Sequence, residues 1–366
     1  MDLKSWTVKK LENVATLQRG FDLPNRKRID GDVPIISSAG TIGCHKQAMV
    51  NGPGVVTGRY GSIGEMFYVD KNFWPLNTTL WVKDFHNNDE KYVYYLLSSL
   101  DFKKFSDKTG VPGVNRNDLH KIRVVLAPKE CQKPIVNVLE IWEIAIAKTE
   151  QLIAAKEKQF DWFMKRYINE KCDAWEHLKT EELFESISIK NNPGEALLSV
   201  TQDRGVIPRT MLERRVMSPK GSTDSYKLVE SGNFVISLRS FQGGLEYSQY
   251  RGIVSPAYTV LTNKLPLCEA FYIHFFKSHI FINKYLRKAV IGIRDGRQVS
   301  FPDLQTVKLP LPTLEEQKAI AELLTAVKKE IDLLRNKLAL LKKQKRGLMQ
   351  KLLTGEWRVN TIKDVA

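Results

Sequence analysis

Two stretches of the chain carry hydrophobic residues at heptad positions, and in the second stretch an interleaved apolar series gives alternating spacings of three and four. One series is Leu139, Ile146, Ile153 and Phe160, and the other is Leu324, Ile331, Leu338 and Leu352, with Val327, Leu334, Leu341 and Leu348 interleaved in the second stretch. Such spacing over several heptads is typical of a coiled-coil seam rather than of a helix with one wide buried face. We therefore expect two long helices that pair through these residues.

The remaining sequence predicts mixed α and β structure. Short β-rich runs between glycine and proline turns occur at 54–56, 76–82, 234–238 and 257–261. Helices are expected near 90–100 and 269–281. The fold class is thus α+β.

The chain also repeats itself. A step of 185 residues carries Asp118 onto Asp303 and Gln132 onto Gln317, and it continues without a gap through the long helix. Upstream, a step of 180 aligns Arg59 with Arg239, Gly64 with Gly244 and Thr79 with Thr259. Since two ungapped registers occur in the same order, we interpret the chain as two copies of one unit.

The repeat predicts a circular, pseudo-two-fold order. Residues 357–366 resemble residues 6–15, so the end of the sequence repeats its beginning. We predict a first domain at 1–127, a helix at 128–170, a second domain at 171–312, a helix at 313–354 and a tail at 355–366. Helices from successive copies in one chain are expected to pack antiparallel.

The ends of the two helices are marked unequally. Thr313 to Glu316 forms a capping-box pattern and Gly355 a glycine stop, whereas Pro128 replaces Thr313 in the first copy. The basic run at 342–346 fits either a DNA contact or a solvated helix face.

The net charge of the chain favours nucleic acid as a partner. The 366 residues carry a formal net charge of +15, and a field of that sign attracts polyanions. No apolar run is long enough for a membrane span, and none follows a basic start as in a signal peptide. The four scattered cysteines fit reduced thiols, so we expect a cytoplasmic protein without a zinc site.

Catalytic patterns are missing from the sequence. The glycines between Gly58 and Gly64 lack the Gly-Lys-Ser/Thr of a phosphate loop, and we interpret them as tight turns that direct Arg59, Tyr60 and Ser62 outward. His274 and His279 are five residues apart, which puts them on different helix faces. Asp118 and Asp303 recur in both copies without a second carboxylate and are expected at helix or strand ends. We expect a non-catalytic chain with no metal and no cofactor of its own.

A resemblance to a known family is carried by the segments at 31–35, 54–64, 235–244, 252–258 and 309–320. Over essentially the whole chain, the sequence resembles the specificity (S) subunit of Type I restriction-modification systems. The most specific of these segments is Leu309-Pro-Leu-Pro-Thr-Leu-Glu-Glu-Gln317, which precedes the second long helix. In the first copy it has drifted but keeps Glu130 and Gln132.

The resemblance implies an architecture and a set of partners. Each of two target-recognition domains would read one half of a bipartite DNA sequence in the major groove, and the helix pair would set the unread spacer. Two modification subunits that bind S-adenosylmethionine would methylate adenine N6, and restriction subunits would use ATP and Mg.

Residues that contact DNA are expected on turns that carry Arg, Asn, Gln, Ser or Tyr. The candidates are Ser37, Ser38, Arg59, Tyr60, Ser62, Asn115 and Arg116 in the first copy and Gln202, Arg204, Arg239, Ser240, Gln242, Arg294 and Arg297 in the second. Arg59 and Arg239 align, so we interpret them as phosphate contacts, because base readers should differ between copies that read different sequences.

Two alternatives stay open from the sequence. One is an interaction scaffold with two adhesive domains on a coiled-coil spacer and no DNA. The other is a fused enzyme whose catalytic domain is unrecognisable, which binding of S-adenosylmethionine by the isolated chain would reveal.

Overall fold

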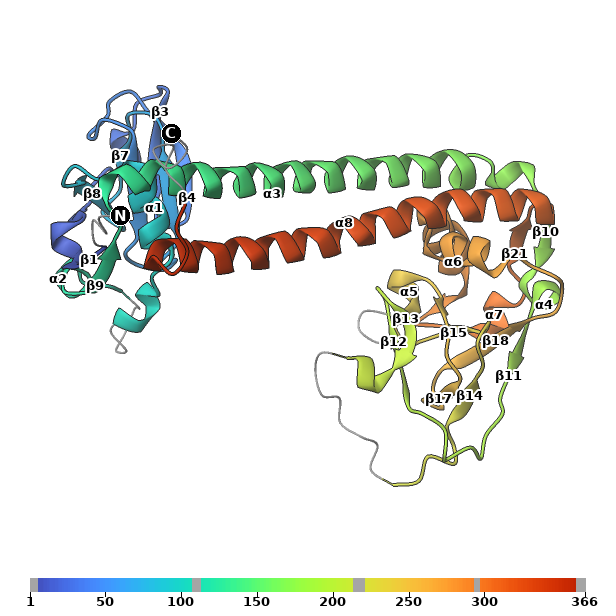
Figure 1. The fold of residues 1–366 in the computed structure, drawn as a ribbon. Helices are drawn as coiled ribbons and strands as arrows, with labels where there is room; N and C mark the ends of the chain where they lie inside the picture. The colour runs from blue at the N-terminus through green and yellow to red at the C-terminus, as the bar shows by residue number, and fades with distance from the viewer. Residues whose placement is uncertain (1–5, 107–112, 213–220, 293–296, 360–366) are drawn as a thin grey trace, which may run out of the picture. The chain divides into compact units, whose positions relative to one another are not determined.

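The chain forms two compact units, and each contains one end of both long helices (Figure 1). In this computed structural model the described residues are 6–106, 113–212, 221–292 and 297–359. Unit 1 comprises residues 1–150 and 336–366, and unit 2 comprises residues 151–335.

The two predicted long helices are present. Helix α3 spans Lys129–Phe163 and continues as a π-helix over Met164–Asn169, and α8 spans Leu314–Thr354. The residues of the heptad series are buried or half-buried, while most of their neighbours on the same helices are exposed. The 3–4 spacing is therefore the pattern that the structure buries.

The helices run antiparallel in both units. In unit 1, Lys345 pairs with Glu143 at 2.7 Å and Lys342 pairs with Glu150 at 2.7 Å. In unit 2, the pairs are Lys156 with Glu330 at 2.8 Å and Arg335 with Glu157 at 2.5 Å. Two lysines of the basic run at 342–346 thus pair with glutamates of the facing helix.

The predicted capping box at the start of α8 forms only in part. The Glu316 backbone N–H donates to Thr313 Oγ1 at 3.3 Å, which is the expected half. The Glu316 carboxylate, however, accepts from Lys171 Nζ at 3.0 Å and from Trp175 Nε1 at 3.1 Å. Partners remote in sequence therefore compete for the side chain that a local cap would use.

The N-terminal segment packs against the end of α8. Gly355 has a φ of 77°, as expected for a residue that ends a helix. A Cβ at Gly355 would lie 2.8 Å from the ring of Trp6. Trp357, which aligns with Trp6 in sequence, is instead exposed beneath Lys351 Nζ at 4.5 Å from its ring centroid. Tail residues 360–366 lie outside the described residues.

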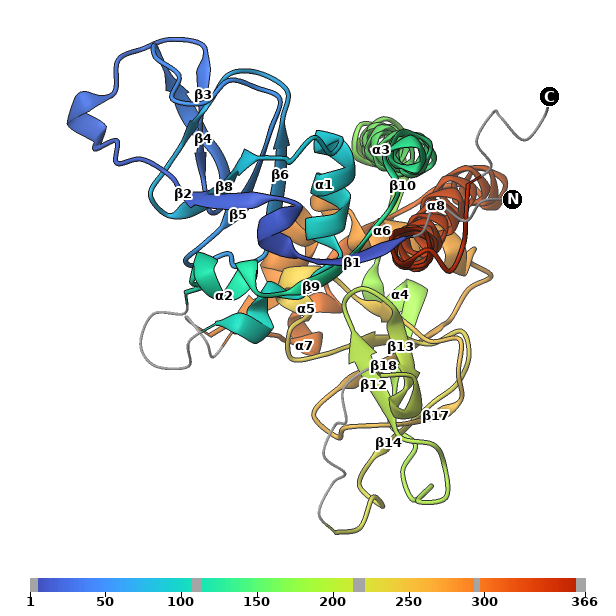
Figure 2. The ribbon, with the colours of Figure 1, turned by 60° about the vertical axis from the view of Figure 1, so that its left-hand side comes forward.

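Unit 1 is built on a four-stranded antiparallel sheet in the order β2-β8-β5-β6, with α1 against β5 and β6 (Figure 2). A second sheet has the order β4-β3-β7, and β1 pairs with β9. The strands are β1 Thr7–Lys10, β2 Thr16–Arg19, β3 Val33–Ser37, β4 Gly40–His45, β5 Gly54–Gly58, β6 Met66–Val69, β7 Trp74–Pro75, β8 Thr79–Asp84 and β9 Arg123–Leu126. The helices are α1 Glu90–Ser98 and α2 Arg116–His120, with 3-10 turns at Leu11–Asn13, Asn25–Lys27 and Phe102–Phe105.

Unit 2 repeats this plan. Its four-stranded antiparallel sheet has the order β11-β18-β15-β16, and β10 pairs with β21. The strands are β10 Glu176–Lys179, β11 Phe184–Ile187, β12 Leu198–Thr201, β13 Gly205–Pro208, β14 Lys227–Val229, β15 Phe234–Ile236, β16 Glu246–Tyr247, β17 Gly252–Val254, β18 Thr259–Asn263, β19 Val290–Ile291, β20 Gln298–Val299 and β21 Lys308–Leu311. The helices are α4 Thr180–Leu183, α5 Ser240–Gly243, α6 Glu269–Lys277 and α7 Phe301–Leu304, with short turns at Cys172–Ala174, Arg209–Met211, Phe281–Tyr285 and Leu286–Ala289.

Two predicted strands begin later than the sequence suggests. The run at 76–82 becomes a strand only at Thr79, whose N–H donates to Leu76 O at 2.9 Å in a turn. The run at 257–261 begins as a strand at Thr259, after a turn in which Tyr258 N–H donates to Ser255 O at 3.0 Å. Apolar composition alone does not show where a turn uses the backbone.

The repeat step of 185 is confirmed by matching hydrogen bonds of Gln132 and Gln317. Gln132 Oε1 accepts from the N–H of Asp89, the residue before α1, at 2.8 Å. Gln317 Oε1 accepts from the N–H of Cys268, the residue before α6, at 2.9 Å. Each amide Nε2 also donates to a carbonyl just before its own long helix, at Ala127 O (3.1 Å) and at Pro312 O (2.9 Å).

The upstream step of 180 is wrong by one residue in the strands and the helix. Val56 pairs with Trp81 in unit 1, whereas Val235 pairs with Val260 in unit 2, a step of 179 on both strands. The buried positions of α1 and α6 follow the same step. Because side chains alternate along a strand, a slip of one residue would exchange the two faces of the sheet. Carried on into the loop after β5, the step of 179 aligns Arg59 with Leu238, one position before Arg239.

In each unit, the largest hydrophobic cluster contains residues of the four-stranded sheet and of the long helices. In unit 1, Leu352 and Leu353 of α8 pack with Tyr92 of α1 and Leu139 of α3. In unit 2, Leu324 of α8 packs with a cluster of aromatic residues that includes Phe271 and Phe275 of α6. The helix ends are thus part of the domain cores.

Candidate nucleic-acid interface

In unit 1, a hairpin tip presents the first two candidate residues. Strand β3 ends at Ser37 and β4 begins at Gly40. The Ser37 hydroxyl donates to Gly40 O at 2.9 Å and accepts from Ala39 N–H at 3.2 Å, so it closes the turn. Ser38 lies at the tip, and its hydroxyl does not close the turn through a hydrogen bond to any described residue.

The loop after the central strand β5 lies directly beside this tip. A Cβ added at Gly58 would lie 3.3 Å from Ser38 Cβ, and one at Gly61 would lie 3.8 Å from Ser38 Oγ. Gly61 and Gly64 have φ values of 72° and 81°, which fits the tight turns expected from the sequence. The loop is anchored where Arg59 N–H donates to Thr78 O at 2.9 Å.

Two side chains of this loop stack on each other. The Arg59 guanidinium lies 4.6 Å from the centroid of the Tyr60 ring, and the ring is 38% exposed. A stacked arginine is held in place without losing its charge. The pair can therefore contact a phosphate or a base from a fixed position.

A third segment joins the same surface. Val114 N–H donates to Arg59 O at 3.0 Å, and Tyr60 forms a β-bridge with Gly113. The chain then enters α2, where the Asn115 side chain accepts from Asn117 N–H at 3.0 Å and caps the helix. Arg116 is exposed in the first turn of α2. The segments at 37–38, 58–62 and 113–116, far apart in sequence, are thus neighbours.

The same surface holds residues that the sequence did not single out. The 3-10 turn Phe102–Phe105 contacts this loop, because a Cβ at Gly64 would lie 3.5 Å from Phe102 Cβ. Lys103 and Lys104 are exposed on it, and Phe105 is 39% exposed. Cations beside exposed aromatic rings suit binding of nucleic acid, but two lysines in a lysine-rich chain give little sequence signal.

Unit 2 has a comparable hairpin tip. The Thr201 hydroxyl donates to Gly205 O at 2.9 Å and accepts from Arg204 N–H at 3.1 Å, as Ser37 does in unit 1. Gln202 is exposed at this tip. Arg204 is exposed as well, and it pairs with Asp203 at 3.8 Å and donates to Met211 O at 3.2 Å.

The segment after β15 lies against this tip. Helix α5 follows Arg239, which is exposed, and a Cβ at Gly243 would lie 3.0 Å from the Gln202 side chain. Gln242 is also exposed. Ser240, by contrast, is 2% exposed, and its Oγ accepts from Ser237 N–H at 2.8 Å. Its hydroxyl holds the turn instead of facing outward.

The last candidates of unit 2 come from the segment before α7. The Arg297 guanidinium lies 5.2 Å from the centroid of the Phe241 ring, so it joins the surface formed by α5. Arg294 lies outside the described residues. Lys277 of α6 was not singled out from the sequence, yet its Nζ donates to Gln202 O at 3.2 Å and to Gly243 O at 2.9 Å.

Histidine side chains mostly serve the fold. His120 Nε2 accepts from Leu17 N–H at 2.9 Å, and His45 Nδ1 accepts from Ile29 N–H at 3.0 Å. His274 is buried, its Nε2 contacts Thr325 Oγ1 at 3.1 Å, and burial lowers its pKa to about 4. Across the described ranges, His, Cys, Asp and Glu side chains do not gather into a group that could hold a metal ion. Asp118 and Asp303 lie in the first turns of α2 and α7, as expected.

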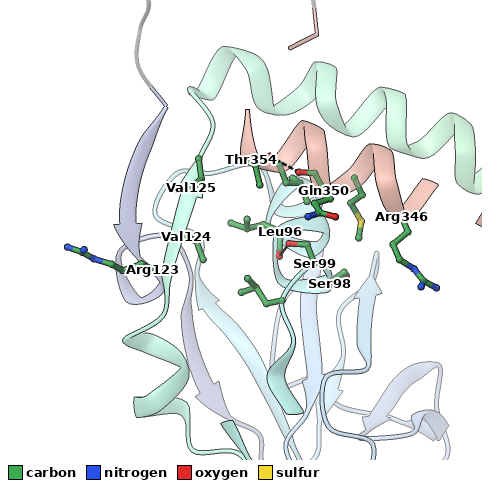
Figure 3. A pocket seen from close by; sticks show the side chains of 12 residues that line it. Leu96, Ser98, Ser99, Arg123, Val124, Val125, Arg346, Gln350 and Thr354 are labelled. Carbon is green, nitrogen blue, oxygen red and sulfur yellow. Dashed lines mark hydrogen bonds between the residues drawn. The ribbon is translucent and has the colours of Figure 1, made fainter. Parts of the chain in front are cut away.

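A groove in unit 1 lies outside the candidate surface. It has a volume of about 610 Å³ and is lined by the end of α1, strand β9 and the last turns of α8 (Figure 3). Arg123 and Arg346 stand at its edges, and Thr354 Oγ1 donates to Gln350 O at 2.9 Å. None of the seven candidate residues of unit 1 lines it.

Among the described helices, none is long and apolar enough to cross a membrane.

Similarity to known proteins agrees with this geometry. The family model of the Type I restriction modification DNA specificity domain matches residues 4–157 and 173–343, once for each copy. A Type I restriction enzyme MjaVIII specificity subunit from Methanocaldococcus jannaschii is 27% identical over 337 residues, which cover 82% of this chain and 77% of that protein. A putative MjaX specificity subunit from the same organism is 25% identical over 305 residues, which cover 74% and 68%.

Solved structures show the same fold. The S subunit of a Type I restriction-modification system from M. genitalium superposes with a TM-score of 0.63 at 15% identity, covering 96% of this chain and 97% of that one. A chain from a structure of complex assembly and conformational transition of the type I R-M system gives 0.56 at 15% identity, with 97% and 99% covered. With two matched specificity domains and the fold of these subunits, the chain belongs to the family of Type I restriction-modification DNA specificity subunits.

Proposed function

We propose that each unit reads one half of a bipartite DNA target, with the candidate surfaces described above in the major groove. The proposal is supported by the way in which separate segments of each unit meet on one surface. In each unit a hairpin tip, the loop after the central strand and a third segment bring exposed polar and basic side chains together. Side chains of these types recognise base edges, and lysine and arginine bind phosphates.

The contacts divide into two kinds. Ser38, Tyr60 and Arg116 in unit 1, and Gln202, Gln242 and Arg297 in unit 2, differ between the copies and are our candidates for base reading. Ser37, Asn115 and Ser240 hold turns and act by positioning their neighbours.

We still propose that Arg59 and Arg239 contact phosphates, although their alignment between the two copies no longer supports this role. They no longer occupy equivalent positions, so the argument from a shared contact fails. Arg239 is exposed and forms no ion pair with a carboxylate of the described residues. A cation that is not neutralised by the protein is suited to a DNA phosphate.

The helix pair is proposed to set the spacer and to dock two modification subunits. Its outward faces carry apolar side chains that the pairing leaves exposed, among them Ile141, Ile144 and Leu340 in unit 1 and Trp162 and Leu333 in unit 2. Exposed apolar side chains mark a surface that binds proteins where they form a contiguous patch. We further propose that S-adenosylmethionine, ATP and Mg are bound by partner subunits and not by this chain.

The adenine methylome of the native host, with and without this gene, tests the proposal. Deletion is expected to abolish one gapped N6-methyladenine motif, whose two halves are then the target. An unchanged methylome would contradict the proposal and favour a scaffold that does not read DNA. Titration of the isolated chain with S-adenosylmethionine is expected to show no binding, whereas binding would indicate a catalytic role of its own.

A further inference from the structure

Lys277 connects three segments of unit 2 at the edge of the candidate surface. It is the last residue of α6, and its side chain is 31% exposed. Its Nζ donates to Gln202 O at 3.2 Å on the hairpin tip and to Gly243 O at 2.9 Å at the end of α5. The same ammonium forms an ion pair with Glu246 of β16. An ammonium has three donors, and all three have acceptors here.

The ion pair is costly for the fold. The Glu246 side chain is only 2% exposed, and its Oε2 lacks a hydrogen-bond partner within the described part of the chain. Burial raises the pKa of Glu246 in spite of the adjacent Lys277. Buried ion pairs add little or nothing to stability relative to apolar side chains of similar volume. The arrangement is thus better explained by the geometry that it imposes than by stability.

Unit 1 holds its hairpin tip without such a pair. At the step of 179, the positions of Glu246 and Lys277 correspond to Phe67 and Ser98, which carry no charge. There the Ser98 hydroxyl donates to Tyr94 O at 2.7 Å within α1. The tip at Ser38 instead packs directly on Gly58. Of the two units, only unit 2 therefore has a lysine at this position that joins the hairpin tip to the segment after β15.

We infer that Lys277 is a positioning residue that fixes the Gln202 tip relative to the 239–243 segment and thereby sets which bases unit 2 accepts. Both segments present exposed polar side chains, and a base-reading amide must be placed to within a fraction of an ångström to hydrogen-bond two atoms of one base. Lys277 binds their backbones, so it acts on recognition without contact to DNA. The inference rests on the proposed function of the two units.

The test is the double variant Lys277→Met, Glu246→Met in the complete system, read out as the adenine methylome. Removing both partners avoids leaving a buried charge alone. We expect one half of the motif to lose discrimination against single mismatches by about tenfold or more, because a mismatch costs about that factor when a base contact is intact. The other half should stay unchanged.

A matched control is Lys227→Met. Lys227 is also partly buried in unit 2, and its Nζ donates to a carbonyl, Tyr258 O at 2.5 Å, but not to either segment of the candidate surface. It should leave both halves as in the wild type. The inference would be overturned if the double variant discriminated against mismatches equally well in both halves of the motif, or if it lost discrimination equally in both. A wild-type methylome without any gapped motif would instead overturn the proposed function.

A second variant covers failure of the double variant to fold, which circular dichroism would show. Gly243→Ala keeps the ion pair but places a Cβ 3.0 Å from the Gln202 side chain, which must move. We expect altered reading of the same single half. If this variant reads both halves as the wild type does, the placement of Gln202 against Gly243 does not matter and the inference is wrong.

Discussion

Single side chains in this molecule divide into those that hold turns and those that face solvent. Ser37, Thr201 and Ser240 each bind backbone atoms of their own turn, while Gln202 and Arg239 are exposed and Ser38 is half-buried at its hairpin tip. Short hydroxyl side chains compete well for nearby backbone groups, so a serine in a turn is as easily a structural residue as a contact.

The proposed phosphate contact is tested by Arg239→Ala. Binding of all DNA sequences by the assembled complex should weaken about equally, and the slope of log affinity against log salt should fall by about one. Arg251→Ala is the matched control, because Arg251 is also exposed in unit 2 but is paired with Glu195 and Glu230. A loss of specificity at one base position would refute the phosphate role.

His274 predicts a pH dependence of stability. Burial lowers its pKa from 6.5 to about 4, with a further contribution from Lys328, so the folded state prefers the neutral ring. The unfolded state binds the proton first as pH falls. The stabilisation is therefore full above about pH 6.5 and is lost by about pH 4, at a cost of about 3 kcal/mol.

Denaturant unfolding of His274→Gln between pH 4 and 7 measures this contribution. The variant should show a weaker pH dependence than the wild type, whereas His279→Gln, at an exposed position of unit 2, should not differ from it. Equal slopes for the wild type and His274→Gln would show that the ring is not kept neutral by the fold.

At the scale of elements, the start of each long helix is tied to the helix of its domain by one buried amide. Gln132 and Gln317 are each 1% exposed, and each bridges a backbone N–H and a backbone carbonyl. Local sequence gives only a glutamine near a helix start. The partners lie 43 and 49 residues away, so packing defines the role.

Gln317→Met tests this tie. It keeps the side-chain length but leaves the Cys268 N–H and the Pro312 carbonyl without partners, at about 1–3 kcal/mol for each buried group. We expect a fall of about 2–4 kcal/mol in the free energy of unfolding, measured by urea denaturation. Gln344→Met, at an exposed position of the same helix, should change it by less than about 0.5 kcal/mol. Similar values for both variants would contradict the prediction.

At the scale of the whole molecule, the heptad pattern predicts a ruler. Insertion of seven residues at the same level of α3 and α8 keeps the seam in phase and lengthens each helix by about 10 Å. The methylome should then show a longer unread spacer between two unchanged half-sites. An insertion of seven residues in α8 alone breaks the pairing of the seam and is expected to abolish methylation. A spacer of unchanged length after the double insertion would refute the ruler.

The sequence by itself determined the features that depend on periodicity and repetition. The long helices, their antiparallel pairing, the two mixed α/β domains and the family all follow from spacings of apolar residues and from motifs such as 309–317. These signals are strong because each extends over many residues, so that one deviation changes little.

Tertiary structure alone decided the features that depend on single positions. It replaced the step of 180 by 179, which separated Arg59 from Arg239, because strand pairing fixes the face on which a side chain lies. In the folded chain the Glu316 carboxylate accepts hydrogen bonds from Trp175 and Lys171. Lys277 likewise donates to Gln202 and Gly243. Each of these contacts joins residues remote in the chain, and a side chain chooses among such partners only when folding has brought them within hydrogen-bond distance.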